Sequence, residues 1–223
     1  MSTLISRKLL KLPKLLIYII LGASLLLNAF LLKQKSPADS VKVLGVIDGD
    51  TLVLAGKVRL RLRHIYAPEL QFCGGQEAKT ELEKMVSGKS VRIEEKIMDQ
   101  QGRPMALVYQ GSTLINQSML ESGWVRYHSD LTSRTDEIQA VADQAKAEHL
   151  GIYSPSCYQK ENPDNPKCNI KGNIDKSTKV KKYYLPNCAQ YNFTIVEKDI
   201  GEDWFCTEKE AQAAGFSRAE TCK

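Results

Sequence analysis

Between residues 41 and 109, apolar residues form short runs or alternate with polar ones, and this pattern predicts β-strands. Around these segments, apolar residues three or four positions apart predict helices that end near a glycine. Strands and helices mixed in this way indicate an α+β fold. The expected strands are 41–46, 51–54, 57–65, 90–97 and 105–109, and the expected helices are 76–86, 114–122 and 135–150.

The N-terminal segment has a different pattern. From Leu15 to Leu32 the chain is uncharged and almost wholly apolar, a run of about eighteen residues that is long enough to cross a bilayer. The apolar core of a cleaved signal peptide is shorter, about 7–15 residues. Four basic residues precede the run, so we expect a basic cytoplasmic N-terminus at 1–14, an uncleaved transmembrane anchor at 15–32 and a polar linker at 33–40. The rest of the chain would then be exported to the periplasmic or extracellular face.

A turn and a strand in the first predicted hairpins bring charged residues together. Asp48-Gly49-Asp50 lies between two apolar runs, as in a hairpin turn, and arginines then alternate with leucines over residues 59–63. Proline at 68 ends that strand and leaves Glu69 in the following loop. A carboxylate can hold a hard cation, an arginine can fork onto a phosphate, and a glutamate can orient or deprotonate water. These residues form a candidate phosphodiester site.

A third motif extends this pattern, because Asp99-Gln-Gln-Gly-Arg103 precedes another apolar strand. Taken in order, Asp-Gly-Asp-Thr, Arg-x7-Glu and Asp-x2-Gly-Arg resemble the thermonuclease, or staphylococcal-nuclease-like, family over about residues 41–153. The resemblance implies a five-stranded OB-fold β-barrel with helices and calcium-dependent cleavage of DNA and RNA. It also implies that Arg61 and Arg103 clamp phosphate, that Glu69 is the catalytic glutamate and that Asp50 is a calcium ligand.

One position departs from the family pattern. The residue three before the glutamate is expected to be a second calcium-binding aspartate, and here it is Tyr66. A neutral phenol removes one formal charge from the cation site, so we expect weaker calcium binding, with Asp48 as a second candidate ligand. An alternative interpretation follows, in which the barrel only captures nucleic acid at the cell surface after its metal site has decayed. Retention of Glu69 beside both arginines favours the enzyme, because binding of a polyanion needs no carboxylate.

The C-terminal third has two predicted parts. Residues 154–180 are polar and rich in Asn, Lys and Pro, as in a linker or tail. Residues 181–223 carry Tyr-Leu-Pro-x-Cys, Trp-Phe-Cys and Glu-Ala-x-x-Ala-Gly-Phe, and they resemble a small module appended to exported bacterial nucleases and related to the metal-binding domain of the Ada DNA-repair protein. A helix is expected from Thr207 to Gly215, with Thr207 as its N-cap. A second alternative makes this module the functional end, docking to a partner with the barrel as its scaffold.

Six cysteines and an apolar N-terminal segment suggest an oxidising compartment. Zinc sites commonly use Cys-x2–4-Cys pairs, which the chain lacks, and residues 181–223 contain no histidine. We therefore favour disulfides over zinc in the C-terminal module, while the pairing stays open. The cysteines are Cys73, Cys157, Cys168, Cys188, Cys206 and Cys222.

Composition adds little to this picture. The chain of 223 residues can hold one ordinary domain and additional segments, and its formal net charge of +5 suits a polyanionic partner. With the motifs above, the expected partners are DNA, RNA or both, and a membrane through the N-terminal segment, with the protein a monomer. The three histidines, His64, His128 and His149, are assigned no chemistry, and Trp124 is expected in the core.

Overall fold

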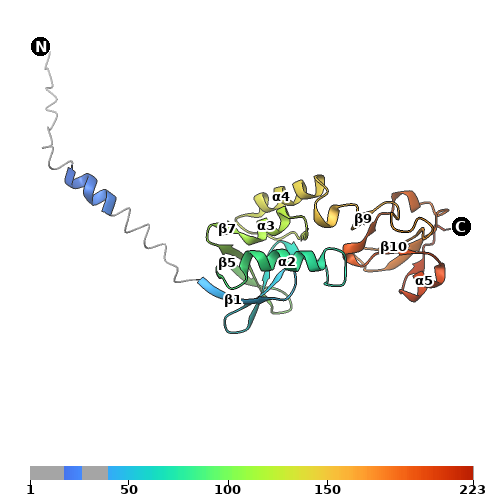
Figure 1. Ribbon diagram of the computed structural model, residues 1–223, viewed down its shortest axis with the longest axis horizontal. Coiled ribbons are helices and arrows are strands. Elements are labelled where there is room, and N and C mark those ends of the chain that lie inside the picture. The colour runs from blue at the N-terminus through green and yellow to red at the C-terminus, as the bar shows by residue number, and fades with distance from the viewer. Residues whose placement is uncertain (1–17, 27–39, 223) are drawn as a thin grey trace, which may run out of the picture. The chain divides into compact units, whose positions relative to one another are not determined.

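The computed structural model describes residues 18–26 and 40–222 (Figure 1). Residues 18–26 form a helix, and residues 40–222 form a separate compact unit. In the described part of the chain, no helix combines the length and the apolar composition needed to span a bilayer. The expected cytoplasmic segment 1–14 and most of the linker 33–40 lie outside the described residues, and the anchor expected at 15–32 is described only in its central part.

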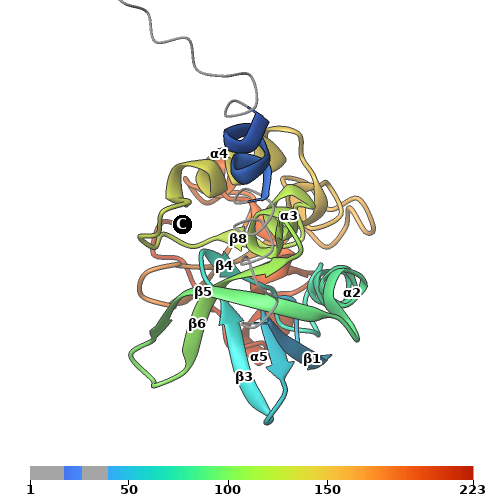
Figure 2. The same ribbon diagram turned by 90° about the vertical axis from the view of Figure 1, so that its left-hand side faces the viewer.

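Five strands close into a barrel: β1 (Ser40–Val46), β2 (Thr51–Leu54), β3 (Val58–Leu62), β5 (Ser90–Met98) and β6 (Pro104–Gln110). Their order is β3-β2-β1-β5-β6, with antiparallel neighbours, and a parallel pairing of β3 with β6 closes the ring (Figure 2). The short β7 (Thr113–Leu114) pairs with the outer edge of β6. This arrangement confirms the five-stranded barrel that the family resemblance implies.

The third strand is shorter than predicted, since β3 ends at Leu62 and not at residue 65. His64 has φ +63°, a left-handed conformation that interrupts a strand. The chain then continues as β4 (Ile65–Tyr66), which pairs with β8 (Arg126–Tyr127) outside the barrel. This break turns Tyr66 and the residues after it toward a different part of the molecule than an unbroken strand would.

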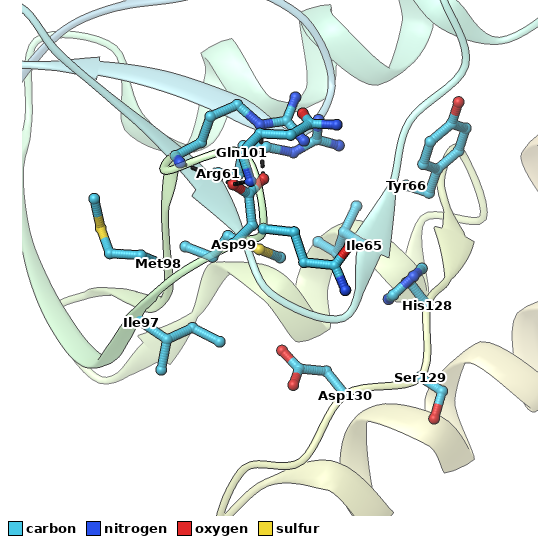
Figure 3. A pocket seen from close by; sticks show the side chains of 13 residues that line it. Arg61, Ile65, Tyr66, Ile97, Met98, Asp99, Gln101, His128, Ser129 and Asp130 are labelled. Atoms are coloured by element: carbon cyan, nitrogen blue, oxygen red, sulfur yellow. Dashed lines mark hydrogen bonds and ion pairs between the residues drawn. The ribbon is translucent and has the colours of Figure 1, made fainter.

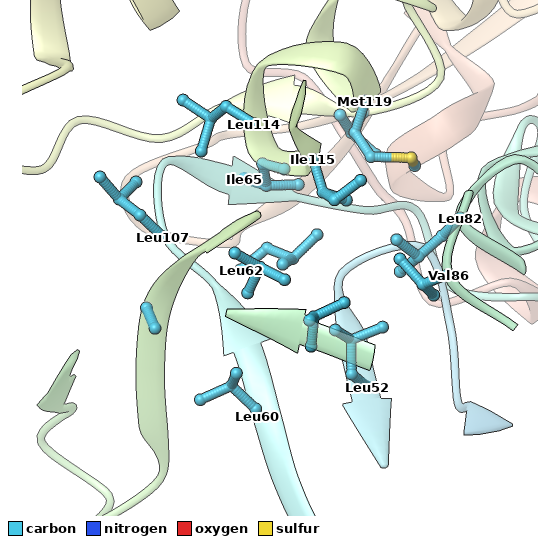
Figure 4. Packing of buried hydrophobic residues seen from close by; sticks show 14 of the residues in the cluster. Leu52, Leu60, Leu62, Ile65, Leu82, Val86, Leu107, Leu114, Ile115 and Met119 are labelled. Atoms are coloured by element: carbon cyan, nitrogen blue, oxygen red, sulfur yellow. The ribbon is translucent and has the colours of Figure 1, made fainter. Parts of the chain in front are cut away.

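Three helices cover the barrel: α2 (Gly75–Val86), α3 (Ile115–Glu121) and α4 (Thr135–Ala147), followed by the short 3-10 helix η2 (Gly151–Tyr153). Their apolar residues pack with those of the strands into one core (Figure 4). Each fully buried leucine or isoleucine stabilises the fold by roughly 1.5–3 kcal/mol. Residues with no more than 1% exposure in this core include Leu52, Leu60, Leu62, Leu82, Leu107, Ile115, Met119 and Ile138.

The C-terminal module has a sheet of its own. It contains β10 (Ile170–Ile174), β11 (Lys181–Tyr184), β13 (Trp204–Phe205) and β14 (Ser217–Arg218), in the order β13-β10-β11-β14. Helix α5 (Glu208–Ala213) packs on it through Ala211, and Thr207 Oγ1 accepts a hydrogen bond from Glu210 N at 3.2 Å, which confirms the predicted N-cap. The remaining elements are β9 (Tyr158–Gln159), β12 (Val196–Glu197), η3 (Tyr191–Phe193) and η4 (Lys198–Ile200).

Residues 154–180, expected as a linker, contribute to this module. β10 pairs with both β11 and β13, and Ile170, Lys171 and Gly172 are buried. Because this strand is short and lies among polar residues, its apolar pattern is too weak to predict it. The module therefore includes chain that precedes residue 181.

All six cysteines form disulfides, namely Cys73–Cys157, Cys168–Cys206 and Cys188–Cys222. The expectation of disulfides is confirmed, and no cysteine is left free. Two bridges close the small module, and the first bridge connects the loop after Glu69 to the chain after η2. A disulfide that closes a loop of this length raises the free energy of unfolding by about 3–5 kcal/mol. That is a large contribution for a module with a small core.

Candidate active site

The turn between β1 and β2 is held by its own residues. Asp50 N donates to Asp48 Oδ1 at 3.0 Å, a side-chain hydrogen bond typical of aspartate in turns. A Cβ on Gly49 would overlap the side chain of Ala78 on α2 and lie 2.9 Å from Ala67 Cβ. Only glycine fits at this close approach, so packing against α2 sets the position of both aspartates.

Asp50 lies at the centre of a small hydrogen-bond network. It is 3% exposed, and its Oδ2 accepts from Arg61 Nη2 at 2.7 Å and from Ala67 N at 3.1 Å. Its Oδ1 accepts from Thr51 Oγ1 at 2.7 Å. Burial raises the pKa of the Asp50 carboxyl, and the Arg61 guanidinium opposes that rise by favouring the charged form. This carboxylate thus joins the hairpin, strand β3 and the chain that leads to Glu69.

Arg103 is placed by Asp99 in the loop between β5 and β6. The Asp99 carboxylate accepts from the backbone N of Gln101 at 2.9 Å and of Arg103 at 2.8 Å, and from Arg103 Nε at 2.7 Å. Hydrogen bonds from Arg103, first from its backbone, lower the pKa of Asp99. Arg103 is still 48% exposed on its side chain. Our reading of the sequence gave Asp99 no role of its own, although the Asp-x2-Gly-Arg spacing is the signal for this turn.

The five residues singled out from the sequence line one hollow of about 270 Å³. Two carboxylates come from the β1–β2 turn, one arginine from β3, the second from the β5–β6 loop, and the glutamate from the loop after β4. They are Asp48, Asp50, Arg61, Glu69 and Arg103. Segments separated by more than fifty residues in the chain, as Asp48 and Arg103 are, therefore meet at one place on the barrel.

A larger hollow of about 500 Å³ shares Arg61, Tyr66 and Arg103 with the first one. Figure 3 shows Ile97 and Met98 on one side of it and Tyr66 and His128 on the other, with Arg61 and Asp99 between. Ile97 is 41% and Met98 60% exposed, so this hollow offers apolar surface next to cationic groups. That combination suits a ligand with both an apolar ring and a negative charge.

Arg63 does not join the site, although it was expected on the same cationic face as Arg61. Because the strand ends at Leu62, Arg63 turns inward and is 4% exposed. Its Nε and Nη2 donate to the two carboxylate oxygens of Asp130 at 2.6 and 2.8 Å, and Nη1 donates to Glu95 O at 2.8 Å. The hydrogen bond from Arg63 lowers the pKa of Asp130. Arg63 therefore holds the loop that carries Asp130 in place.

The hollow offers oxygen ligands for a cation. Asp48 and Asp50 are two carboxylates of the kind that Ca²⁺ prefers, and Tyr66, where the family resemblance implies a second aspartate beside Asp50, is a phenol. Within residues 18–26 and 40–222, no three His, Cys, Asp or Glu side chains gather as a metal-binding group. The donor set fits an oxygen-preferring cation in kind, and it leaves several coordination positions to water and substrate.

Comparison of the chain with known proteins identifies a family. The family model described as "Staphylococcal nuclease homologue" matches residues 59–155. The "Micrococcal nuclease" of Shigella flexneri is 30% identical over 128 residues, 51% of this chain and 72% of its own. The "Uncharacterized endonuclease" of Haemophilus influenzae is 29% identical over 155 residues, 68% of this chain and 81% of its own.

A plant protein is similar over about half of the chain. The "Probable staphylococcal-like nuclease CAN2" of Oryza sativa subsp. japonica is 34% identical over 117 residues, 52% of this chain. The chain covers only 30% of the length of that relative. The matched family model ends at residue 155, so the resemblance of the C-terminal module to the Ada-type domain stays a prediction. Over its barrel domain, this chain belongs to the staphylococcal nuclease homologue family.

Proposed function

We propose that this protein is a nuclease that hydrolyses phosphodiester bonds of DNA, RNA or both with the assistance of calcium. The observation that carries the proposal is the meeting of Asp50, Arg61, Glu69 and Arg103 in one hollow. The names of two similar proteins, an endonuclease and a nuclease, support the same reaction class.

The two arginines account for recognition and charge stabilisation. A guanidinium has five N–H donors, so Arg61 can hold Asp50 and still fork onto a phosphate. Arg103, half-exposed at the rim, approaches the same phosphate from the β5–β6 loop. Both would stabilise the negative charge that grows on the phosphoryl oxygens as water attacks. A calcium ion held by Asp50 and Asp48 would polarise the phosphate and offset part of its charge.

Glu69 is the remaining group with acid–base chemistry in the hollow. It is exposed and lies in the loop after β4, where the chain leaves its pairing with β8. From there its carboxylate can orient or deprotonate the attacking water. A binding site for a polyanion would gain nothing from this carboxylate, which favours the enzyme over a binding module.

The test follows digestion of single-stranded DNA and of RNA by the full chain with its disulfides intact, with calcium or with chelator, beside Glu69→Gln. Calcium-dependent cleavage that Glu69→Gln abolishes supports the proposal. Binding of DNA that weakens steeply with salt, with no cleavage under either condition, would establish the alternative in which the site is only a binding surface.

We also propose that the protein acts outside the cytoplasm, anchored by its N-terminal segment. The apolar run from 15 to 32 supports an anchor, and three disulfides suit an oxidising compartment. Protease added to intact cells or spheroplasts should remove the barrel domain and leave a short N-terminal fragment in the membrane. Full protection of the barrel domain would place it in the cytoplasm.

A further inference from the structure

The C-terminal module forms one wall of a third hollow, which Glu69 also lines. This hollow has a volume of about 210 Å³ and is shared between the barrel domain and the module. The barrel side contributes Tyr66, Glu69 and Phe72, and the module contributes Ile174, Lys176 and Lys179. Since Tyr66 and Glu69 also line the candidate active site, a ligand could run from one hollow into the other.

The two sides of this hollow are joined firmly. Arg126 on β8 donates from Nη2 to Asp199 Oδ1 at 2.7 Å and also pairs with Glu197. The Cys73–Cys157 disulfide is next to these contacts, because Lys198 N donates to Cys157 O at 2.8 Å. Separating a partly buried arginine from two carboxylates is costly, so the module keeps one position relative to Glu69.

The two lysines project from an ordered loop between β10 and β11. Asp175 Oδ1 accepts four hydrogen bonds, from the backbone N and the hydroxyl of both Ser177 and Thr178, at 2.6–3.0 Å. Lys179 N also donates to Asp175 O at 2.8 Å. The backbone of the loop is thus preorganised, so ligand binding would need to order only the side chains of Lys176 and Lys179.

The two lysines are the cationic groups that line this hollow, and Glu69 at its border contributes a carboxylate. Asp199 uses both carboxylate oxygens on Arg126, and Glu197 is shared between Arg126 and Lys176. Lys176 remains 61% exposed on its side chain, and no carboxylate among the described residues pairs with Lys179. An ammonium has three donors, so Lys176 can contact a phosphate while it keeps Glu197.

Aromatic rings complete the surface. Tyr66 is 47% exposed and lines all three hollows, and the half-buried Phe72 lies in the same wall. Exposed aromatic rings next to cationic side chains are the combination that holds unpaired bases by stacking and the backbone by charge. In a duplex the base faces are covered by their neighbours, so a duplex could not use such rings.

We propose that the groove formed by Tyr66, Phe72, Lys176 and Lys179 is a second subsite for a single-stranded nucleic acid that continues past the active site. The proposal rests on the proposed nuclease function and adds the substrate class and the role of the C-terminal module. Tyr66 stacks on a base where the strand leaves Glu69, and the lysines hold the phosphates beyond it. The tyrosine that departs from the family pattern thus belongs to substrate binding.

Binding is measured on the full chain carrying Glu69→Gln, so that the ligand stays intact, with oligothymidylates of two and of about twelve nucleotides over about 50–300 mM salt. Lys179→Ala should weaken binding of the long strand and reduce the slope of log Kd against log salt by about 0.7, the value for one phosphate contact on a single strand. Binding of the dinucleotide should not change. Lys209→Ala, an exposed lysine on α5 that lines none of these hollows, is the matched control.

The stacking role is tested at Tyr66. Tyr66→Ala should weaken binding of the long strand by about 5- to 100-fold, and Tyr66→Phe should restore it to within about twofold. If wild type cleaves DNA while Lys179→Ala and Tyr66→Ala bind the long strand as Lys209→Ala does, the subsite is refuted and the nuclease function stands. If wild type neither cleaves nor binds nucleic acid, the proposed function fails and the subsite fails with it.

Discussion

Arg61 Nη2 lies 2.7 Å from Asp50 Oδ2, so the residue proposed to hold phosphate is paired with the residue proposed to hold the cation. Burial raises the pKa of Asp50, and the guanidinium is what keeps a buried carboxylate charged. Asp50 therefore positions Arg61, and Arg61 favours the charged form of Asp50. Removing Arg61 would affect phosphate binding and also the charge state of the cation ligand.

Arg61→Lys should lower kcat by about 10²–10³, because an ammonium cannot hold Asp50 and fork onto a phosphate at the same time. Steady-state kinetics on single-stranded DNA measures the change. Arg59→Lys, an exposed residue on the same strand, is the control and should retain the wild-type rate. Equal rates for the two variants would remove Arg61 from the active site.

Tyr66→Asp should strengthen calcium binding by adding the carboxylate that the family pattern expects. The calcium concentration for half-maximal cleavage should fall by about tenfold or more, because the charge of the ligands sets the affinity of such sites. Tyr66→Asn, similar in size to aspartate but neutral, is the matched control. If both variants need the same calcium concentration, this position does not face the cation.

Asp99→Ala should reduce kcat/KM by about 10- to 100-fold, although Asp99 is proposed to position Arg103 and not to touch substrate. The variant loses the hydrogen bonds that hold Gln101 and Arg103, so the arginine samples many positions. Asp99→Asn keeps an acceptor for the backbone and should recover part of the rate. Unchanged kinetics in Asp99→Ala would show that the loop is shaped without this carboxylate.

Glu202 should make stability depend on pH. It is 2% exposed, and burial raises its pKa to about 7, against hydrogen bonds from Ile174 N and Glu197 N that favour the charged form. The folded protein then binds this proton more tightly than the unfolded chain, whose carboxyl has a pKa near 4.5. Proton binding by Glu202 therefore adds to the free energy of unfolding, by at most about 3 kcal/mol. This contribution is complete below the pKa of the unfolded chain and is lost as the pH rises through about 7.

Thermal unfolding of the full chain between about pH 5 and pH 7.5 measures this effect. The difference in Tm between wild type and Glu202→Gln should shift steadily against wild type as pH rises, because the amide does not titrate. A difference that stays constant over this range would mean that Glu202 has an ordinary pKa in the folded protein.

Gly201→Ala should weaken the contact between the module and the barrel domain. Gly201 has φ +87°, and an added Cβ would lie 2.7 Å from Phe72 Cζ. Gly215→Ala is the control, because Gly215 has nearly the same φ, +86°, and open space around it. Both variants should lose about 1 kcal/mol for the backbone conformation, and Gly201→Ala should lose roughly 1–3 kcal/mol more from the overlap. Chemical denaturation compares them, and equal losses would mean that Phe72 moves aside freely.

Local signals in the sequence determined much of the barrel domain. The β-branched, apolar run over residues 51–54, the Asp48-Gly49-Asp50 turn and the apolar face of residues 76–86 each involve neighbours in the chain, so their elements follow from propensity and periodicity. The absence of paired cysteine spacing indicated disulfides for the same reason, since ligand spacing is a local property. The five candidate residues came from motifs, and the barrel brings them together.

Tertiary structure alone decided what depends on distant contacts. The left-handed His64 separates Arg63 from Arg61 and sends it to Asp130, 67 residues later. The pairing of Cys73 with Cys157, the short strand β10 and the approach of Lys179 to Glu69 have no local pattern, because each is stabilised only when remote segments meet. The set of side chains that line one hollow depends on how the whole chain folds, so no short stretch of sequence predicts it.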